Sequence, residues 1–384
     1  MRLARQGEPN SSAVRDDEWR ITMPAPKFDP KELTVAAEVP NFRFPDAPPI
    51  PLYSFPVTPK EAFRALYKRE PVWQITGLEQ ILFVPRVNPD NVARGFVFDG
   101  QPFDAAAYGG GPDMFGIEWE YVEQVGGSMV RPGKPFMEDA NEWYDKLVWP
   151  DIDTWDWEGA ASRSTEFLSS DKFNYCWLMN GWYERLISFM DFEGAIMAMV
   201  DEDQTDAVHA LFDKLTDLYI RMFDKYLTYF PQIDGFCIHD DWGSQKETFF
   251  SPAVAAEMIV PYMRRVTDFL HSKGKFCDLH SCGQLLKQVP NIIAAGWDSW
   301  SPQLMNDVET IHELYGDKIV IGAYPAIYDP ATKSEEEQRE AARAFAEKFC
   351  DPEKPTLFSF YAGEILTTPF REELYKCSRV NYCK

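Results

Sequence analysis

The segment SPAVAAEMIVPYMRRVTDFLHSKGKFCDLHSC, residues 251–282, contains the signal of a helix followed by the signal of a strand. Ser251 and Pro252 are typical of a helix start, and Gly274 is typical of a helix end. Residues 275–282 then form a short run that carries Phe, Leu and two Cys, which favours a buried strand. A helix that leads directly into such a strand is typical of a parallel α/β fold.

Seven further segments have the composition of short strands, and helical patterns lie between most of them. Residues 206–230, for example, place apolar side chains at spacings of three and four, as an amphipathic helix does. The eight strands alternating with helices predict a closed (β/α)8 TIM barrel. In addition to 275–282, the predicted strands are 71–76, 120–126, 173–180, 234–241, 297–302, 318–324 and 356–363.

The first part of the chain has a different composition. Residues 1–58 are rich in proline and charge, and proline excludes both a long helix and a central strand. We therefore expect an extended N-terminal arm over 1–58 and a barrel over 59–384. Such an arm would wrap around the barrel or around a second subunit, and the second arrangement would make the protein a homodimer.

Composition excludes several classes of protein. The formal net charge of −23 opposes binding to nucleic acid or to anionic membranes, so neither is expected as a partner. No run approaches the roughly 18 apolar residues of a membrane helix, and the N-terminus lacks the apolar core of a signal peptide. Seven Cys, an odd number spread along the chain, favour a reducing compartment, and we expect a cytoplasmic protein.

In a barrel of this kind the active site lies at the C-terminal ends of the strands. The predicted strand ends therefore give the candidate site residues directly. They are Asn180, His239, Asp240, Asp241, His280, Cys282, Gln303, Tyr324, Tyr361 and Glu364.

His280 and Cys282 are two residues apart, so their side chains point to the same side of the strand. Imidazole and thiolate are good zinc ligands, and the pair predicts a zinc site. The alternative is a buried Cys beside a hydrogen-bonded His. Cys277 has the opposite parity and is expected in the core.

His239 and Asp241 follow the preceding predicted strand, and Asp240 lies between them. Adjacent carboxylates beside a His suit acid–base or metal chemistry, although Asp is also common in turns. We assign a catalytic role to His239 and Asp241. The aromatic and amide groups at the other strand ends are expected to bind a flat organic substrate. They are Asn180, Trp182, Tyr183, Tyr324 and Tyr361.

Several longer segments resemble the uroporphyrinogen decarboxylase-like superfamily, and within it the cobalamin-dependent methyltransferase branch. The similarity extends over about residues 60–384, and the best-matching subgroup is the methyltransferase component of corrinoid-dependent aryl O-demethylase systems. The segments are FVPRVNPDNVARGFVFDG, GGSMVRPGKPFMEDANEWYDKLVWPDID, HDDWGSQ, FSPAVAAEMIVPYMRRVTDFLHSKGK and LHSCG.

The resemblance implies a (β/α)8 barrel, a zinc ion and a corrinoid (cobalamin) carried by a separate corrinoid protein. In the zinc enzymes of this branch, the ligands are an H-x-C pair and a later Cys. His280 and Cys282 match the pair, but Ala362 stands where the later Cys is expected. The resemblance therefore leaves the third ligand to Glu364, or to His239 or Asp241 of the neighbouring strand.

The reaction implied is demethylation of a methoxylated aromatic, with zinc or an acid activating the ether oxygen and the methyl group passing to cob(I)alamin. The first alternative is methyl transfer from a methylated corrinoid to a thiol or a pterin. A uroporphyrinogen-type decarboxylase is a lesser alternative, because the N-terminal Arg-containing motif of that enzyme is not found here. A barrel that binds a ligand without catalysis is another.

Overall fold

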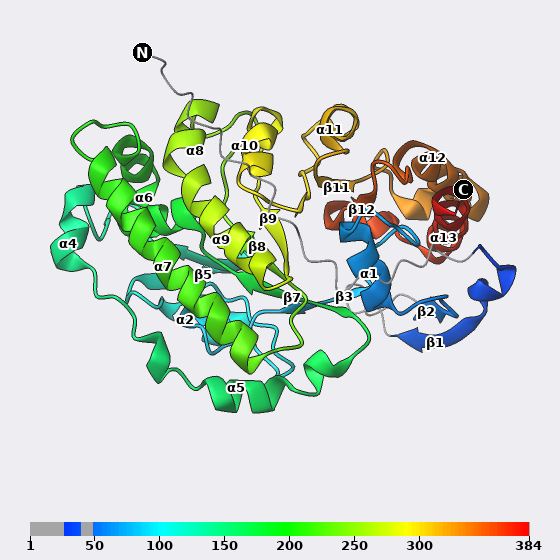
Figure 1. Cartoon of the computed structure of the whole chain (residues 1–384), viewed down its shortest axis with the longest axis horizontal. Helices are drawn as coiled ribbons and strands as arrows, with labels where there is room; N and C mark the ends of the chain where they lie inside the picture. The colour runs from blue at the N-terminus through cyan, green and yellow to red at the C-terminus, as the bar shows by residue number, and fades with distance from the viewer. Residues whose placement is uncertain (1–26, 40–48, 384) are drawn as a thin grey trace, which may run out of the picture.

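A seven-stranded parallel sheet forms the centre of the molecule (Figure 1). The computed structural model describes residues 27–39 and 49–383 of the chain. The strands follow the order β12-β11-β10-β9-β8-β7-β3, so neighbours in space are mostly neighbours in the chain. They are β3 (Gln80–Phe83), β7 (Phe173–Leu178), β8 (Gly235–His239), β9 (Phe276–His280), β10 (Ser299–Trp300), β11 (Val320–Ala323) and β12 (Thr356–Phe358).

The two edges of this curled sheet meet in one short segment of the chain. Ile75 forms a parallel bridge with Leu357 of β12, and the amide of Phe358 donates to the carbonyl of Ile75 at 2.8 Å. A few residues later, β3 pairs in parallel with β7, from Gln80 opposite Phe173 onward. The fold is therefore a TIM-barrel-like α/β fold, which confirms the predicted fold class.

Six of the eight predicted strands coincide with β7 to β12, and the first, 71–76, is represented by the bridge at Ile75. The prediction of a barrel strand at 120–126 was wrong. Residues 120–122 of that segment lie in β5 (Glu118–Val122), which pairs with β4 (Gly111–Pro112) and β6 (Gly127–Val130) in a separate antiparallel sheet, and the residues after them form a 3-10 turn. Trp119 of β5 is buried between two exposed Glu residues, which suits a sheet with one exposed face and not a barrel strand covered on both sides. The barrel position belongs to β3.

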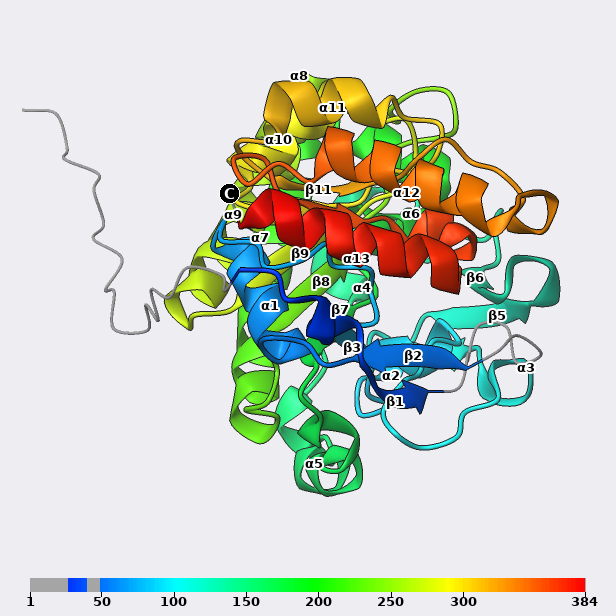
Figure 2. The same ribbon diagram turned by 90° about the vertical axis from the view of Figure 1, so that its right-hand side faces the viewer.

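Helices cover the outer face of the parallel sheet (Figure 1). The predicted helix at 251–274 is divided at Ile259 into α8 and α9, because Pro261 at the start of α9 has no amide hydrogen to continue the earlier turn. Figure 2 shows α12 beside α13, and the pairs Arg339–Glu372 and Arg343–Glu373 join them. The covering helices are α6 (Trp182–Ala198), α7 (Thr205–Tyr229), α8 (Pro252–Met258), α9 (Val260–Ser272), α10 (Val289–Ala294), α11 (Val308–Tyr315), α12 (Glu335–Phe349) and α13 (Thr368–Tyr382).

Helix α1 (Pro59–Tyr67) closes the end of the barrel at which the strands begin. It starts at Thr58, which accepts a hydrogen bond from the amide of Glu61, while the Glu61 carboxylate accepts one from the amide of Thr58. Phe63 stacks on Phe173, the first residue of β7, with ring centroids 4.5 Å apart. Because this end is filled, the strand ends on the opposite side are where a site can open.

Parts of the predicted arm are described. Residues 27–58 contain η1 (Pro30–Leu33) and the antiparallel pair β1 (Val35–Val39) and β2 (Ile50–Tyr53). The Glu32 carboxylate binds Arg379 of α13, with Oε2 2.8 Å from Nε. Residues 1–26 and 40–48 lie outside the described residues, so the arm, the boundary at 58 and the homodimer stay predictions.

The insertion between β3 and β7 contains the short elements α2 (Pro89–Ala93), α3 (Ala105–Tyr108), η2 (Glu123–Val125), η3 (Ala140–Glu142), α4 (Trp143–Lys146), η4 (Ile152–Thr154), α5 (Trp157–Ser164) and η5 (Phe167–Ser169). Later in the chain, single turns follow the strands: η6 (Leu286–Gln288), η7 (Pro330–Thr332) and η8 (Phe360–Ile365). Over the part of the chain that the structure describes, no helix combines the length and the apolar character needed to cross a membrane.

Buried charges attach the insertion to the barrel. The guanidinium of Arg185 is fully buried in α6 and contacts the carboxylates of Asp90 and Asp113, with Nη1 2.5 Å from Oδ2 of Asp113. Asp90 also accepts hydrogen bonds from Asn180 Nδ2 at 2.9 Å and from the amide of Met114 at 3.0 Å. Burial raises the pKa of Asp90, and the charge of Arg185 opposes that shift. The positive charge of Arg185 thus offsets the cost of burying the carboxylates of Asp90 and Asp113 away from water.

Replacing Arg185 with Leu leaves Asp90 and Asp113 buried without a counter-charge. We expect the free energy of unfolding at neutral pH to fall by about 3–5 kcal/mol, measured by urea unfolding with tryptophan fluorescence. Arg265→Leu is the matched control, since Arg265 lies in exposed ion pairs with Asp213 and Asp217 and should cost less than about 1 kcal/mol. Equal losses for the two variants would contradict the compensating role of Arg185.

Candidate active site

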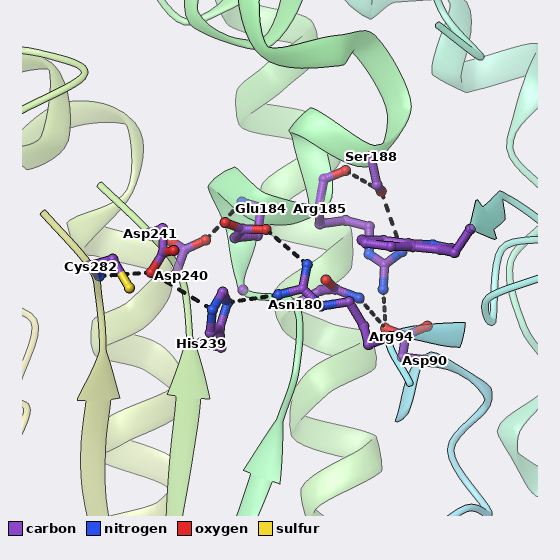
Figure 3. A network of polar contacts seen from close by, with 12 residues as sticks. Asp90, Arg94, Asn180, Glu184, Arg185, Ser188, His239, Asp240, Asp241 and Cys282 are labelled. Atoms are coloured by element: carbon purple, nitrogen blue, oxygen red, sulfur yellow. Dashed lines mark hydrogen bonds and ion pairs between the residues drawn. The ribbon is translucent and has the colours of Figure 1, made fainter. Parts of the chain in front are cut away.

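A cluster of ionisable side chains lies where β8 and β9 end. His239 is the last residue of β8 and His280 is the last residue of β9, and the two are direct partners in the strand register. Their rings stack with centroids 4.8 Å apart and planes inclined by 14°. Figure 3 shows His239, Asp241 and Cys282 above the tips of the strand arrows. These side chains therefore lie together at the strand ends, where the sequence analysis placed them, and their functional roles stay predictions.

The loop after β8 is fixed by Asp240, which is fully buried. Its carboxylate accepts hydrogen bonds from the amide of Glu184 at 2.8 Å and from Trp242 Nε1 at 2.9 Å. Burial raises the pKa of Asp240 to about 8. A Cβ on Gly181 would lie 2.6 Å from the Cβ of Asp240, so only glycine fits where α6 begins. Asp240 therefore anchors the loop, whereas the carboxylate of the neighbouring Asp241 lies near His239 and His280.

Asp241 connects the loops that follow β8 and β9. Its Oδ1 accepts a hydrogen bond from the amide of Cys282 at 2.7 Å and lies 3.8 Å from Nε2 of His239. Among the described residues, His239, Asp241 and His280 each offer a ligand atom within 4.8 Å of the other two. The thiol of Cys282 lies 3.5 Å from His280 Nε2 and 3.8 Å from the hydroxyl of Tyr361.

The Cys282–His280 pair fits two ligand positions of a zinc ion. Tetrahedral Zn²⁺ with bonds of about 2.0–2.3 Å places two ligand atoms about 3.5 Å apart, which matches the separation of Cys282 Sγ and His280 Nε2. Burial, followed by the charge of Asp241, raises the pKa of Cys282 to about 12. Burial lowers the pKa of His280, which favours the neutral imidazole that a metal binds. The thiol therefore needs a cation to ionise at neutral pH.

Glu364 is not brought into this cluster. After β12 the chain enters η8, which directs Tyr361 toward Cys282 and leaves Glu364 exposed. Ala362, which stands at the position of the family's later Cys, is buried. The geometry thus favours a donor from the β8 side over Glu364 as the third ligand.

Most of the residues predicted to bind an aromatic substrate lie elsewhere. Asn180, Trp182 and Tyr183 are fully buried. The chain turns at Gly181 directly into α6, so Trp182 and Tyr183 enter the helix layer, whereas Asn180 donates to Asp90 of the insertion. Trp182 Nε1 donates to Thr216 Oγ1 at 2.9 Å. Tyr324 is also buried, and its hydroxyl donates to the carbonyl of Asn306 at 2.7 Å. Tyr361 does contact the cluster.

Two aromatic residues that the sequence prediction did not assign to the site border His280. The ring of Trp177 lies 5.2 Å from that of His280, and the ring of Phe360 lies 5.9 Å from it. Trp177 has the strand parity of the inward-facing Tyr175, so alternation along β7 was the signal that could have identified it. With Tyr361, these rings form the aromatic wall of the cluster.

Arg94 and Glu184 are the charged residues that sequence reasoning missed. Arg94 Nη2 lies 3.3 Å from Nδ1 of His239, and Arg94 Nη1 lies 3.2 Å from Oε2 of Glu184 (Figure 3). Burial, together with the charge of Arg94, holds the pKa of His239 well below its usual value. Arg94 and His239 are 145 positions apart in the chain, and no local pattern connects them.

Two cavities of about 350 Å³ each lie away from the cluster. One is bordered by β1, β2, the start of α1 and the start of α13, and the other by β5, β6 and the segment before β5. None of their lining residues belongs to the strand-end cluster. The substrate assignments below therefore rest on the cluster itself.

Comparison with known proteins supports the fold and the superfamily. Residues 186–371 match the family model of uroporphyrinogen decarboxylase (URO-D). No curated protein matches the chain. Among solved structures, a methyltransferase from Methanosarcina mazei is similar over 84% of this chain and 98% of its own, with 15% identity and a TM-score of 0.56.

Weaker similarities are to Dispersin B and to the spore cortex-lytic enzyme SleL of Bacillus megaterium. The first has 10% identity, covers 59% of this chain and 74% of its own, and has a TM-score of 0.26. The second has 10% identity, covers 64% of this chain and 66% of its own, and has a TM-score of 0.32. These two support no argument. The family match and the methyltransferase fold together support the resemblance to the uroporphyrinogen decarboxylase-like superfamily.

The metal content of variants tests the ligand set. We expect about one zinc per chain in the purified protein, measured by elemental mass spectrometry. Cys282→Ala should lose most of the metal because it removes a ligand, whereas Glu364→Gln should keep it because Glu364 lies outside the cluster. Full zinc occupancy in Cys282→Ala would remove Cys282 from the ligand set.

The reactivity of Cys282 in the metal-free protein tests its raised pKa. Alkylation by iodoacetamide requires the thiolate, whose fraction grows about tenfold per pH unit below the pKa. With a pKa of about 12, the rate at Cys282 should still rise about tenfold per pH unit up to about pH 10.5, as followed by peptide mass spectrometry. A rate that levels off between about pH 9.5 and 10.5 would show an ordinary thiol with a pKa of about 8.5.

Proposed function

We propose that the protein is a methyltransferase that removes the methyl group of a methoxylated aromatic and delivers it to cob(I)alamin, carried by a separate corrinoid protein. The observation that carries this proposal is the cluster of His239, Asp241 and His280, with the Cys282 thiol beside His280, at a barrel mouth walled by aromatic rings. The fold shared with a methyltransferase supports the reaction class. The methoxylated aromatic and the corrinoid protein are inferred from the aromatic wall and from the superfamily resemblance.

The aromatic wall would hold the substrate ring. Trp177 and Phe360 lie beside the His280 ring, and Tyr361 contacts Phe360. Such faces bind an aromatic ring by stacking and by burying its surface. A ring held there would have its methoxy oxygen close to the polar cluster. The wall therefore orients the substrate as well as binding it.

The polar cluster would act on the ether oxygen. When the methyl–oxygen bond breaks, its electron pair stays on the oxygen, and the corrinoid substrate provides the pair that forms the new bond to the methyl carbon. A zinc ion held by His280, Cys282 and a third donor would polarise that oxygen as a Lewis acid. Asp241 holds the Cys282 loop in place, and His239 faces the same space from the neighbouring strand.

The assay is formation of methylcobalamin from cob(I)alamin and a panel of methoxyarenes, with release of the matching phenol. At least one methoxyarene should react, and His280→Ala should lower the rate about 10²- to 10³-fold, since removing a group that stabilises developing charge has effects of this size. His209→Ala is the control, because His209 lies on α7 and bonds to Tyr262. Reaction of thiols or methylamines while every methoxyarene stays intact would reject the O-demethylase assignment.

A further inference from the structure

The geometry points to Arg94 as a positioning residue that fixes the tautomer of His239. In that tautomer His239 presents Nε2–H to the substrate oxygen. His239 then has no free lone pair for the metal, and Asp241 is the third metal ligand. The identity of the oxygen rests on the proposed function. The tautomer and the ligand assignment rest on contacts within the chain.

Arg94 is held rigidly. It follows α2, and its Nη1 pairs with Glu184 Oε2 at 3.2 Å, with both side chains only 14% exposed. The guanidinium also lies over the ring of Trp119, 5.0 Å from the centroid. An arginine anchored by a carboxylate and an aromatic face has little freedom to turn away from its remaining neighbour.

That neighbour is Nδ1 of His239, 3.3 Å from Nη2. A guanidinium has only donors, so Nδ1 can take part in this contact only as an acceptor. A neutral imidazole with Nδ1 as acceptor carries its hydrogen on Nε2. Arg94 thus determines which nitrogen of His239 is protonated.

The same contact excludes His239 from the metal. A ring nitrogen binds a metal through its lone pair, and in this tautomer the lone pair of Nε2 is occupied by hydrogen. The loop after β8 has two carboxylates. That of Asp240 already accepts hydrogen bonds from the amide of Glu184 and from Trp242 Nε1. Asp241 remains as the oxygen donor near His280, and its Oδ1 also accepts the hydrogen bond of the Cys282 amide.

The Nε2–H group then has a separate task. It lies 3.8 Å from Oδ1 of Asp241, which is too long for a direct hydrogen bond. An ether oxygen bound between the ends of β8 and β9 would be in reach of this donor. As the methyl–oxygen bond breaks, the hydrogen bond strengthens with the charge on oxygen, and the proton stays on His239.

The test is the ¹⁵N spectrum of the protein labelled at histidine, recorded at pH 8. The chain has five His, so the ring signals can be separated, and His239→Gln identifies the signal of residue 239. We expect the Nε2–H tautomer at His239 in the natural protein and in Arg94→Lys, which keeps a donor. Arg94→Met should shift His239 toward a mixture of tautomers. A His239 signal of the Nδ1–H type in the natural protein overturns the proposal.

Metal content provides the second readout. His239→Gln and Arg94→Met should keep zinc close to the natural level, whereas Asp241→Asn should lose most of it. Arg86→Met is the matched control, because Arg86 lies in the same insertion and pairs with Asp99 at 2.7 Å. It should change neither the spectrum nor the zinc. Loss of zinc in His239→Gln would make His239 a ligand and reject the assignment.

Activity separates this inference from the proposed function. With a methoxyarene that reacts, Arg94→Met should lower kcat about tenfold or more with little change in KM, because the affected hydrogen bond strengthens only in the transition state. If no methoxyarene reacts, the proposed function fails, while the tautomer and zinc measurements still decide the role of Arg94.

Discussion

The direct pairing of His239 with His280 in the register of β8 and β9 is the constraint on which the site depends. Side chains alternate between the faces of a strand, so a shift of one residue would move one imidazole to the helix layer. The correct register places the two rings in contact and brings the loops after both strands together. Asp241 can then accept the hydrogen bond of the Cys282 amide, and Gly283, with a φ of +102°, can approach Gly243, where any Cβ would meet backbone.

Adjacent residues in the loop after β8 have different roles because of what surrounds them. Asp240 is buried and accepts hydrogen bonds from the amide of Glu184 in α6 and from Trp242 Nε1. Asp241 is partly exposed and lies near His239. The anchor at α6 also places Glu184 so that it can hold Arg94. One buried carboxylate therefore holds both the loop after β8 and, through Glu184, the residue proposed to orient His239.

The sequence was informative wherever period and position determine geometry. Strand parity placed the side chain of His280 beside that of Cys282, as the structure has them, and the strand-end rule selected His239 and Asp241, which lie near His280. It was misleading for Trp182 and Tyr183, since the turn at Gly181 that sends them into the helix layer depends on the contact with Asp240. The sequence could not identify Arg94 as a site residue, because its contact with His239 arises from tertiary packing of the insertion. The pairing of β5 with β6 in a separate sheet has the same origin.

Ala362 stands where the resemblance places a later Cys ligand, and a zinc site without that Cys would differ in its chemistry. Thiolates are soft, strongly donating ligands, and a carboxylate donates less charge to the metal. With His280, Cys282 and Asp241 as ligands, zinc would keep more of its Lewis acidity than with a second thiolate. That property suits a hard ether oxygen that must accept charge more than it suits a thiol, which needs only to be held as a thiolate. The departure from the family pattern and the aromatic wall of Trp177, Phe360 and Tyr361 therefore favour the same class of substrate.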